Sequence, residues 1–106
     1  MKKQIRHMLP AIEYICNLSS AEQNSHVKTT KKEFLKVLID ILLNVEKGAL
    51  PVSQEVIQQL KPHKRLILSL IAKKTALKTR QNKLMKKGVF AKIFCPLLPV
   101  LRELVE

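Results

Sequence analysis

The chain has no tryptophan, one tyrosine, three phenylalanines and only two glycines among its 106 residues. Any core must therefore be built mainly from leucine, isoleucine and valine. Apolar residues still make up 46% of the chain, which is too many for a disordered basic tail. Two glycines also exclude a flexible linker or a collagen-like tract. A chain of this length fits a single domain, residues 1–106, that buries roughly two thirds of its unfolded surface.

Long uncharged apolar segments are also missing. No such run reaches the ~20 residues that a membrane helix needs, and one of the longest, residues 93–101, contains two prolines. The basic start Lys2-Lys3 is followed by further charges and a proline instead of a continuous apolar stretch, so we expect no secretory signal. These features predict an intracellular protein that is nuclear or virion-associated.

The two cysteines, Cys16 and Cys95, have neither a metal-binding nor a redox spacing. In a reducing compartment, isolated cysteines are typical of reduced thiols in a core. A disulfide or a redox role is the alternative.

Residue patterns typical of enzymes are absent from the sequence. The three histidines have no ligand spacing, and neither a glycine-rich phosphate loop nor a nucleophile elbow occurs. The single aspartate, Asp40, lies in a mostly apolar segment, where we expect it to pair with Lys36 or Lys64 rather than to act as a base. The sequence therefore predicts no enzymatic activity, no cofactor and no metal.

Acidic residues are scarce, and most of them lie in the first half of the chain. The sequence has 20 Lys and Arg against 8 Asp and Glu, a net charge of +12. Residues 1–55 carry eight basic and six acidic side chains, a net of +2, whereas residues 56–106 carry twelve and two, a net of +10. Such self-repulsion opposes compaction, and a polyanion would relieve it. Nucleic acid is the first candidate and an anionic membrane surface the second.

The spacing of apolar residues is helical throughout, and no convincing strand alternation occurs. Residues 5–18 are predicted as a helix in which Pro10 marks the first turn. Ser19 and Glu22 have the spacing of a capping box, and the polar stretch 21–29 is either a short helix or a loop.

The strongest helix prediction covers residues 30–47. Thr30 is the predicted N-cap, Glu33 completes a capping box and Gly48 ends the helix. Three polar residues, spaced by four, interrupt the otherwise apolar segment: Lys36, Asp40 and Asn44. One narrow polar stripe on an apolar helix is typical of the centre of a bundle. We predict an all-α single small helical bundle of four to six short helices around this central helix.

Further helices are predicted toward the C-terminus. Ser53 can cap a short helix, after which Pro62 either begins a new helix or kinks a continuous one. Residues 63–73 and 76–87 are the next two predicted helices, the second with Thr75 as its N-cap. Their outline is that of a helix-turn-helix unit, although nothing in the turn is diagnostic.

Ten cations, with no acid among them, lie on or just before this helix pair. They are Lys61, Lys64, Arg65, Lys73, Lys74, Lys78, Arg80, Lys83, Lys86 and Lys87. Lysine dominates, and lysine binds phosphate as a point charge rather than reading bases with two hydrogen bonds. No aromatic residue lies between Lys61 and Val89 to stack on single-stranded bases. We predict a nucleic-acid interface at these residues; the alternative is a solvated basic face. Residues 61–65 also fit a nuclear import signal.

The C-terminal segment, residues 89–106, is rich in apolar side chains and is broken into short helical pieces by Pro96 and Pro99. Two interpretations of it stay open. Either the segment folds onto the central helix and completes the core, or it is a docking segment that lies on a membrane or a partner.

One stretch of the sequence resembles a known family. The resemblance rests on four segments and one proline in chain order. They are Ile41-Leu42-Leu43-Asn44-Val45-Glu46-Lys47-Gly48, Pro51, Leu60-Lys61-Pro62-His63-Lys64, Lys73-Lys74-Thr75-Ala76-Leu77-Lys78 and residues 84–90. Over residues 38–95 this is similar to small basic proteins encoded by adenovirus-like mobile elements of animals, of the Maverick/Polinton or adintovirus type. The resemblance implies a protein associated with a virion or a genome, with DNA condensation as a role.

The sequence therefore predicts a non-enzymatic basic protein that binds duplex DNA or another polyanion, as in genome packaging, largely without sequence preference. The alternative is a protein–protein interaction module, a viral or domesticated accessory factor that binds an acidic or capsid protein. A membrane-surface binder is the third hypothesis.

Overall fold

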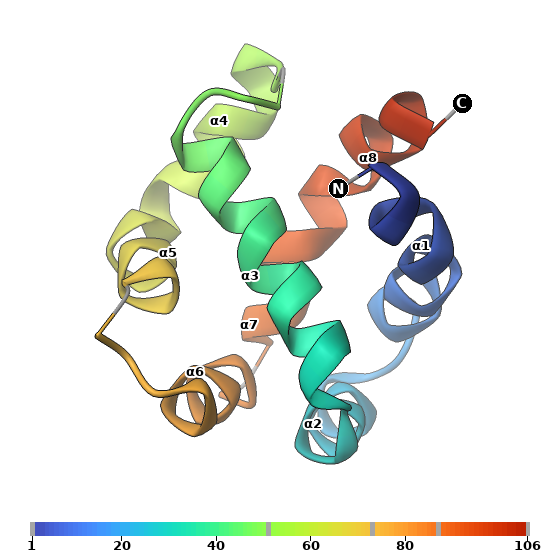
Figure 1. The fold of residues 1–106 in the computed structure, drawn as a ribbon, viewed down its shortest axis with the longest axis vertical. Coiled ribbons are helices and arrows are strands. Elements are labelled where there is room, and N and C mark those ends of the chain that lie inside the picture. Colours follow the sequence, from blue (N-terminus) through green and yellow to red (C-terminus); the bar gives the residue numbers. More distant parts are fainter. Residues whose placement is uncertain (1, 51, 73, 87, 106) are drawn as a thin grey trace.

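The computed structural model describes residues 2–50, 52–72, 74–86 and 88–105. Their helices, in chain order, are α1 (Lys2–Cys16), α2 (Ser20–Thr29), α3 (Lys32–Glu46), α4 (Gln54–Leu60), η1 (Lys61–His63), α5 (Lys64–Ile71), α6 (Leu77–Leu84), α7 (Val89–Phe94), η2 (Cys95–Leu97) and α8 (Leu98–Val105). The short 3-10 helices η1 and η2 join α4 to α5 and α7 to α8 without a break, so these residues form six continuous helical segments and no strand (Figure 1). The all-α prediction is confirmed.

Helix α3 crosses the centre of the molecule, with the other helices arranged around it (Figure 1). Seven of its side chains are buried, and they point in several directions around the helix: Phe34, Leu35, Val37, Leu38, Ile39, Ile41 and Leu42. Lys36 and Asp40 of the polar stripe are exposed, and Asn44 is half-buried. The prediction of a central apolar helix with one polar stripe is therefore confirmed.

Several predicted helix ends are also confirmed. Ser19 accepts a hydrogen bond from the backbone N–H of Glu22, and the Glu22 carboxylate accepts one from the Ser19 N–H, so the capping box is formed and residues 20–29 are helical. The Ser53 hydroxyl accepts a bond from the Val56 N–H at the start of α4. These caps satisfy amide groups that have no partner within the first turn of a helix.

Gly48 ends α3 in a Schellman motif. Its φ is +76°, a left-handed conformation that favours glycine. The Ala49 N–H donates to the Asn44 carbonyl over 2.9 Å, and the Gly48 N–H donates to the Val45 carbonyl over 3.1 Å. Two of the last carbonyls of α3 are thereby satisfied.

The two predicted threonine caps are wrong. Helix α3 begins after Lys31, which makes no side-chain cap, and Thr30 instead ends α2 by donating its N–H to the Val27 carbonyl. The Thr75 hydroxyl donates to the Ser69 carbonyl over 3.2 Å and does not cap α6. Both threonines therefore serve the preceding helix rather than the following one.

Four of the described prolines lie within helical segments, one of them, Pro99, in the first turn of α8. The prediction that Pro10 marks the first turn of α1 is wrong, because that helix begins at Lys2 and contains Pro10 in its interior. Pro62 lies in η1 and Pro96 in η2. A proline lacks the amide hydrogen and clashes with the carbonyl four residues earlier, so a tighter 3-10 turn at these two positions lets the helix continue in a new direction.

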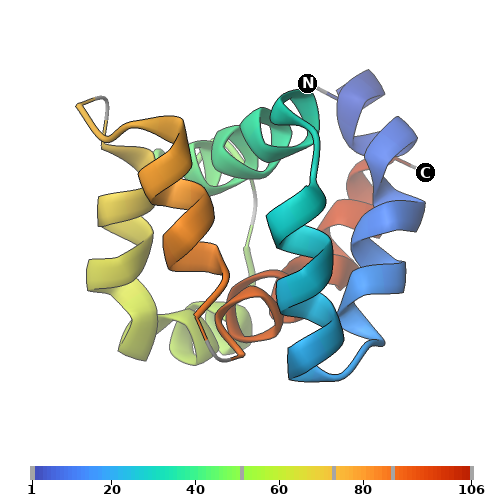
Figure 2. The same cartoon turned by 90° about the horizontal axis from the view of Figure 1, so that it is seen from below.

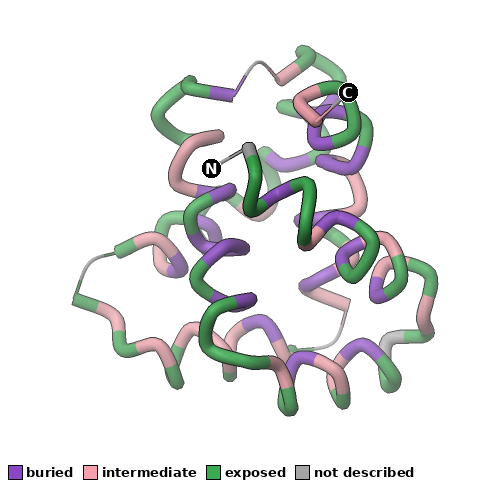
Figure 3. Tube along the Cα trace, turned by 45° about the vertical axis from the view of Figure 1, so that its right-hand side comes forward, coloured by how far each residue is buried: buried purple, intermediate pink, exposed green. Residues whose placement is uncertain are grey.

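The C-terminal segment supplies a large part of the core. Phe90, Ile93, Phe94, Leu97 and Leu101 are each at most 1% exposed. Buried and exposed positions alternate along most of the trace, as one-sided burial of helices requires (Figure 3). In this structure the apolar side chains of the segment thus pack inward. Among the described residues, no helix is long and apolar enough to cross a membrane.

We predict that Leu42→Ala lowers the free energy of unfolding by about 2–5 kcal/mol, because Leu42 is fully buried in α3 and the substitution leaves a cavity. Urea unfolding followed by circular dichroism measures this. Leu68→Ala is the matched control, since Leu68 is 42% exposed and its loss should change the stability by less than about 1 kcal/mol. Equal losses in the two variants would contradict the central position of α3.

Candidate nucleic-acid interface

The predicted basic helices form a hairpin. Helices α5 and α6 contact each other and run side by side in opposite directions (Figure 2). This differs from a helix-turn-helix unit, in which the two helices meet at a steep angle. The start of α5 and the end of α6 therefore lie at the same end of the hairpin.

Apolar side chains attach the hairpin to the core. Ile67 and Leu70 of α5 and Leu84 of α6 are buried. The cations lie at the start of α5, in the turn, along α6 and just after it, at positions that the apolar inner faces do not use. The hairpin is thus held by its inner face, while its outer face is free to contact a ligand.

Most of the predicted cations that the structure describes are exposed to solvent. Six are exposed: Lys61, Lys64, Arg65, Lys74, Lys78 and Lys86. Arg80 and Lys83 are half-buried, and Lys73 and Lys87 lie outside the described residues. Within the described parts of the chain, the one ion pair joins the Arg102 Nε to the Glu13 Oε1 over 3.2 Å, so it involves none of these cations.

Arg80 is placed differently from the other cations. Its guanidinium Nη2 donates to the carbonyl of Ala72, the residue that follows α5, and its Nε is buried without a partner among the described residues. The side chain therefore holds the turn of the hairpin together. It is less available to a phosphate than the exposed lysines.

Lys28 is a cation of this surface that the sequence reasoning missed. The Gln81 Nε2 on α6 donates to the carbonyls of Val27 and Lys28 over 2.7 and 3.1 Å. Both carbonyls belong to the last turn of α2; the Val27 carbonyl also accepts the Thr30 N–H, and the Lys28 carbonyl has the Gln81 amide as its donor. The exposed Lys28 thereby lies beside α6, although 53 residues separate it from Gln81, and no local sequence pattern could indicate this.

The charges at the start of α6 conflict with the dipole of that helix. Its first turn contains Lys78 and Arg80 and no acid. The N-terminus of a helix carries a partial positive charge, so cations there are unfavourable. A bound anion would remove this conflict.

Asp40 does not form the expected ion pair with Lys36 or Lys64 in the described residues, so that expectation is wrong. Its backbone carbonyl instead accepts a hydrogen bond from the Asn44 Nδ2 over 2.7 Å. The carboxylate is exposed on the polar stripe of α3, where water is an adequate partner.

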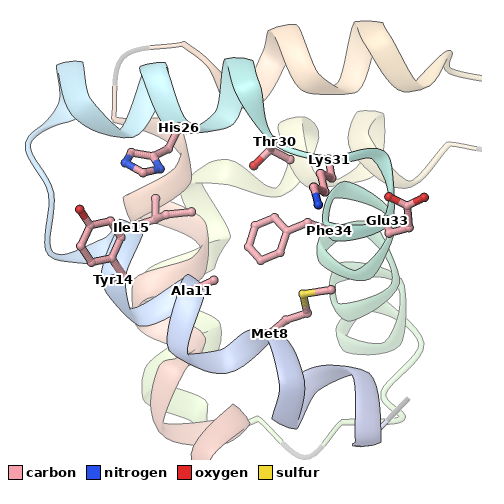
Figure 4. Close-up of a pocket in the computed structure, with 9 residues that line it drawn as sticks. All are labelled: Met8, Ala11, Tyr14, Ile15, His26, Thr30, Lys31, Glu33 and Phe34. Carbon is pink, nitrogen blue, oxygen red and sulfur yellow. The ribbon is translucent and has the colours of Figure 1, made fainter.

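A concave region away from the basic hairpin lies between α1, α2 and α3 (Figure 4). It is a hollow of about 390 Å³, and the Phe34 ring projects into it from α3. Tyr14 and His26 form one rim, with their rings edge to face and their centroids 5.4 Å apart. Lys31 and Glu33 lie at the opposite rim (Figure 4). The wall between the rims is apolar, so this hollow suits an apolar group rather than a phosphate.

In the parts of the chain that the structure describes, no three His, Cys, Asp or Glu side chains gather as a metal site would require. No protein-family model, curated protein or solved structure matches the chain. The basic hairpin is therefore the feature from which a function can be argued.

We predict that Gln81→Ala lowers the free energy of unfolding by about 1 kcal/mol, because the Lys28 carbonyl loses its hydrogen-bond donor and the Val27 carbonyl keeps only the Thr30 N–H. Urea unfolding measures the change. Asn82→Ala is the matched control, since Asn82 is the exposed neighbour on the same helix. If the two variants are equally stable, the amide of Gln81 does not join α6 to α2.

Proposed function

We propose that this protein is a non-enzymatic basic protein that binds duplex DNA through its phosphates, largely without sequence preference, as a genome-packaging protein does. The observation that carries the proposal is the set of six exposed cations on and beside the α5–α6 hairpin, which form no ion pair with any described acid. From Val56 to Arg102 the sequence contains no acid at all. Backbone phosphates are the ligands that such a surface attracts most strongly.

The energetics of the hairpin support the same proposal. Lys78 and Arg80 in the first turn of α6 oppose the dipole of that helix, and the mutual repulsion of the cations on and beside the hairpin opposes folding. Features that weaken a fold locally are expected where a function requires them. Bound phosphate groups would reduce both the conflict with the helix dipole and the repulsion between the cations.

The resemblance to small basic proteins of adenovirus-like mobile elements supports a role in packaging. It covers the helix end at Gly48, the basic region of residues 60–64 and the lysine pair that precedes α6. In that setting the ligand is the genome, and binding without sequence preference is what packaging needs. Nuclear or virion association follows from the same proposal.

We expect the affinity for duplex DNA to depend steeply on salt. If about six cations contact phosphates, log K falls against log salt with a slope of about −5, from roughly 0.9 per phosphate. The triple variant Lys64→Gln, Lys78→Gln, Lys86→Gln removes three exposed charges of the hairpin and should flatten this slope by about 2–3. Fluorescence anisotropy on two duplexes of unrelated sequence gives the slopes, and both duplexes should weaken alike.

The matched control is Lys3→Gln, Lys36→Gln, Lys47→Gln. It removes the same charge from exposed positions of α1 and of α3 and its C-terminal end. Its slope should change by about 1 or less, because long-range electrostatics alone are altered. A folded wild-type protein that does not bind duplex DNA below about 100 μM at ~50 mM salt would overturn the proposal, since basic proteins bind non-specifically under such conditions.

A specific observation favours protein–protein interaction as the second candidate function. A hollow of about 420 Å³ lies between the end of α3, α4 and the start of α5. Val45, Ile57 and Leu60 contribute apolar surface to it, and Ile57 is 45% exposed. Two cations, Lys61 and Lys64, and one acid, Glu46, also line it, so the occupant that fits is an amphipathic helix whose acidic residues face the two lysines.

Ile57→Ser separates this candidate from DNA binding. The probe is a synthetic amphipathic helix of leucine and glutamate, and its affinity should fall about tenfold because an exposed apolar contact is removed. Leu68→Ser is the control, since Leu68 is almost equally exposed but lies outside the hollow. Neither variant should change the affinity for DNA. Equal peptide binding by both variants would exclude the hollow as the docking site.

A further inference from the structure

The two cysteines, 79 residues apart in the sequence, lie next to each other in the fold. Cys16 is the last residue of α1 and Cys95 the first of η2. The Cys95 Sγ lies 3.8 Å from the Cys16 carbonyl oxygen, close enough for a weak S–H hydrogen bond. Both cysteines are free and half-buried, so each retains contact with solvent.

The arrangement of α1 against the C-terminal segment holds this neighbourhood in place. Helices α1 and α8 lie side by side (Figure 1). At one end the Arg6 Nη2 donates to the Val105 carbonyl over 2.8 Å, and further along Arg102 pairs with Glu13. The contact of Cys16 with Cys95 is the next in this series of contacts, in which α1 and the C-terminal segment run in opposite directions.

We propose that Cys16 and Cys95 form an oxidation site, at which a hydroperoxide converts the two thiols into a disulfide that joins α1 to η2. The Sγ of one cysteine attacks the peroxide oxygen, which releases an alcohol, or water from hydrogen peroxide, and leaves a sulfenic acid. The Sγ of the other cysteine then attacks that sulfur, the S–S bond forms and water leaves. The two thiols lose two protons and two electrons in total, and the hydroperoxide is reduced by the same two electrons.

The surroundings of the pair make this reaction slow. Burial, together with a hydrogen bond to the neighbouring Cys95 thiol, raises the pKa of the Cys16 thiol. Since the thiolate is the nucleophile, Cys16 reacts slowly at neutral pH. The pair therefore stays reduced in a reducing compartment and is oxidised only under sustained exposure to peroxide.

Oxidation should stabilise the fold. The disulfide would close a loop from the end of α1 to the start of η2, and a loop of this length strongly restricts the unfolded chain. It would also fix α1 to a segment whose apolar residues form part of the core. We expect the melting temperature to rise by at least about 5 °C. This inference does not depend on DNA binding.

The test uses the full chain, first reduced and desalted, then incubated with hydrogen peroxide. Intact mass spectrometry under denaturing, non-reducing conditions should show a monomer that has lost the mass of two hydrogen atoms. Peptide mapping should find the peptide with Cys16 linked to the peptide with Cys95. Dithiothreitol should reverse both the mass change and the rise in melting temperature.

Cys16→Ser and Cys95→Ser are the matched controls, and each should abolish the loss of hydrogen and the thermal shift. Circular dichroism establishes that the variants are folded, and the mapping on the wild-type chain decides the question even if one of them is not. Two outcomes would overturn the proposal. One is independent addition of oxygen to each cysteine without a disulfide, and the other is disulfide-linked dimers in place of the intramolecular bond.

Discussion

The fold depends on the burial of α3. A helix with seven buried side chains and only a narrow polar stripe cannot lie at the surface, because its apolar groups would remain in water. It must be covered from several directions, and no single short helix of this chain can do that. The structure covers it with segments from both ends of the sequence, α1, α5 and α6 among them. The position of the basic hairpin is thus a consequence of how α3 is enclosed.

Glutamine side chains join the outer helices by donating to backbone carbonyls at helix ends. The Gln23 Nε2, on α2, donates to the carbonyl of Ile15 in the last turn of α1 and to that of Leu18 just after it, over 3.0 and 3.2 Å. Gln81 does the same from α6 for the end of α2. Each amide satisfies C-terminal carbonyls of the helix that it contacts. Helices α1, α2 and α6 are therefore linked in series by side-chain caps.

Features that depend on local sequence were predictable. The narrow polar stripe of α3, the Gly48 helix end and the serine caps at Ser19 and Ser53 each follow from neighbouring residues and were predicted correctly. A glycine that adopts a positive φ or a serine before a helix acts within one turn, so the rest of the fold has little influence on it.

Features that depend on the tertiary structure were not predictable. Thr30 has the pattern of an N-cap, yet its backbone serves the end of α2. Pro10 would start an isolated helix, but packing extends α1 beyond it. For the candidate interface, the sequence indicated which cations gather on α5 and α6. It could not indicate that Arg80 turns toward Ala72 or that Lys28 joins the surface from α2. Both facts are set by contacts with another segment.

The separation of charge from packing on the hairpin has a thermodynamic consequence. The buried residues Ile67, Leu70 and Leu84 hold the hairpin, while the exposed lysines contribute mutual repulsion. A polyanion that binds the folded protein more tightly than the unfolded chain shifts the folding equilibrium toward the folded protein and so stabilises it. Added salt screens the repulsion in the free protein and also weakens the bound state. Stabilisation by DNA should therefore be largest at low salt, where the free protein is least stable.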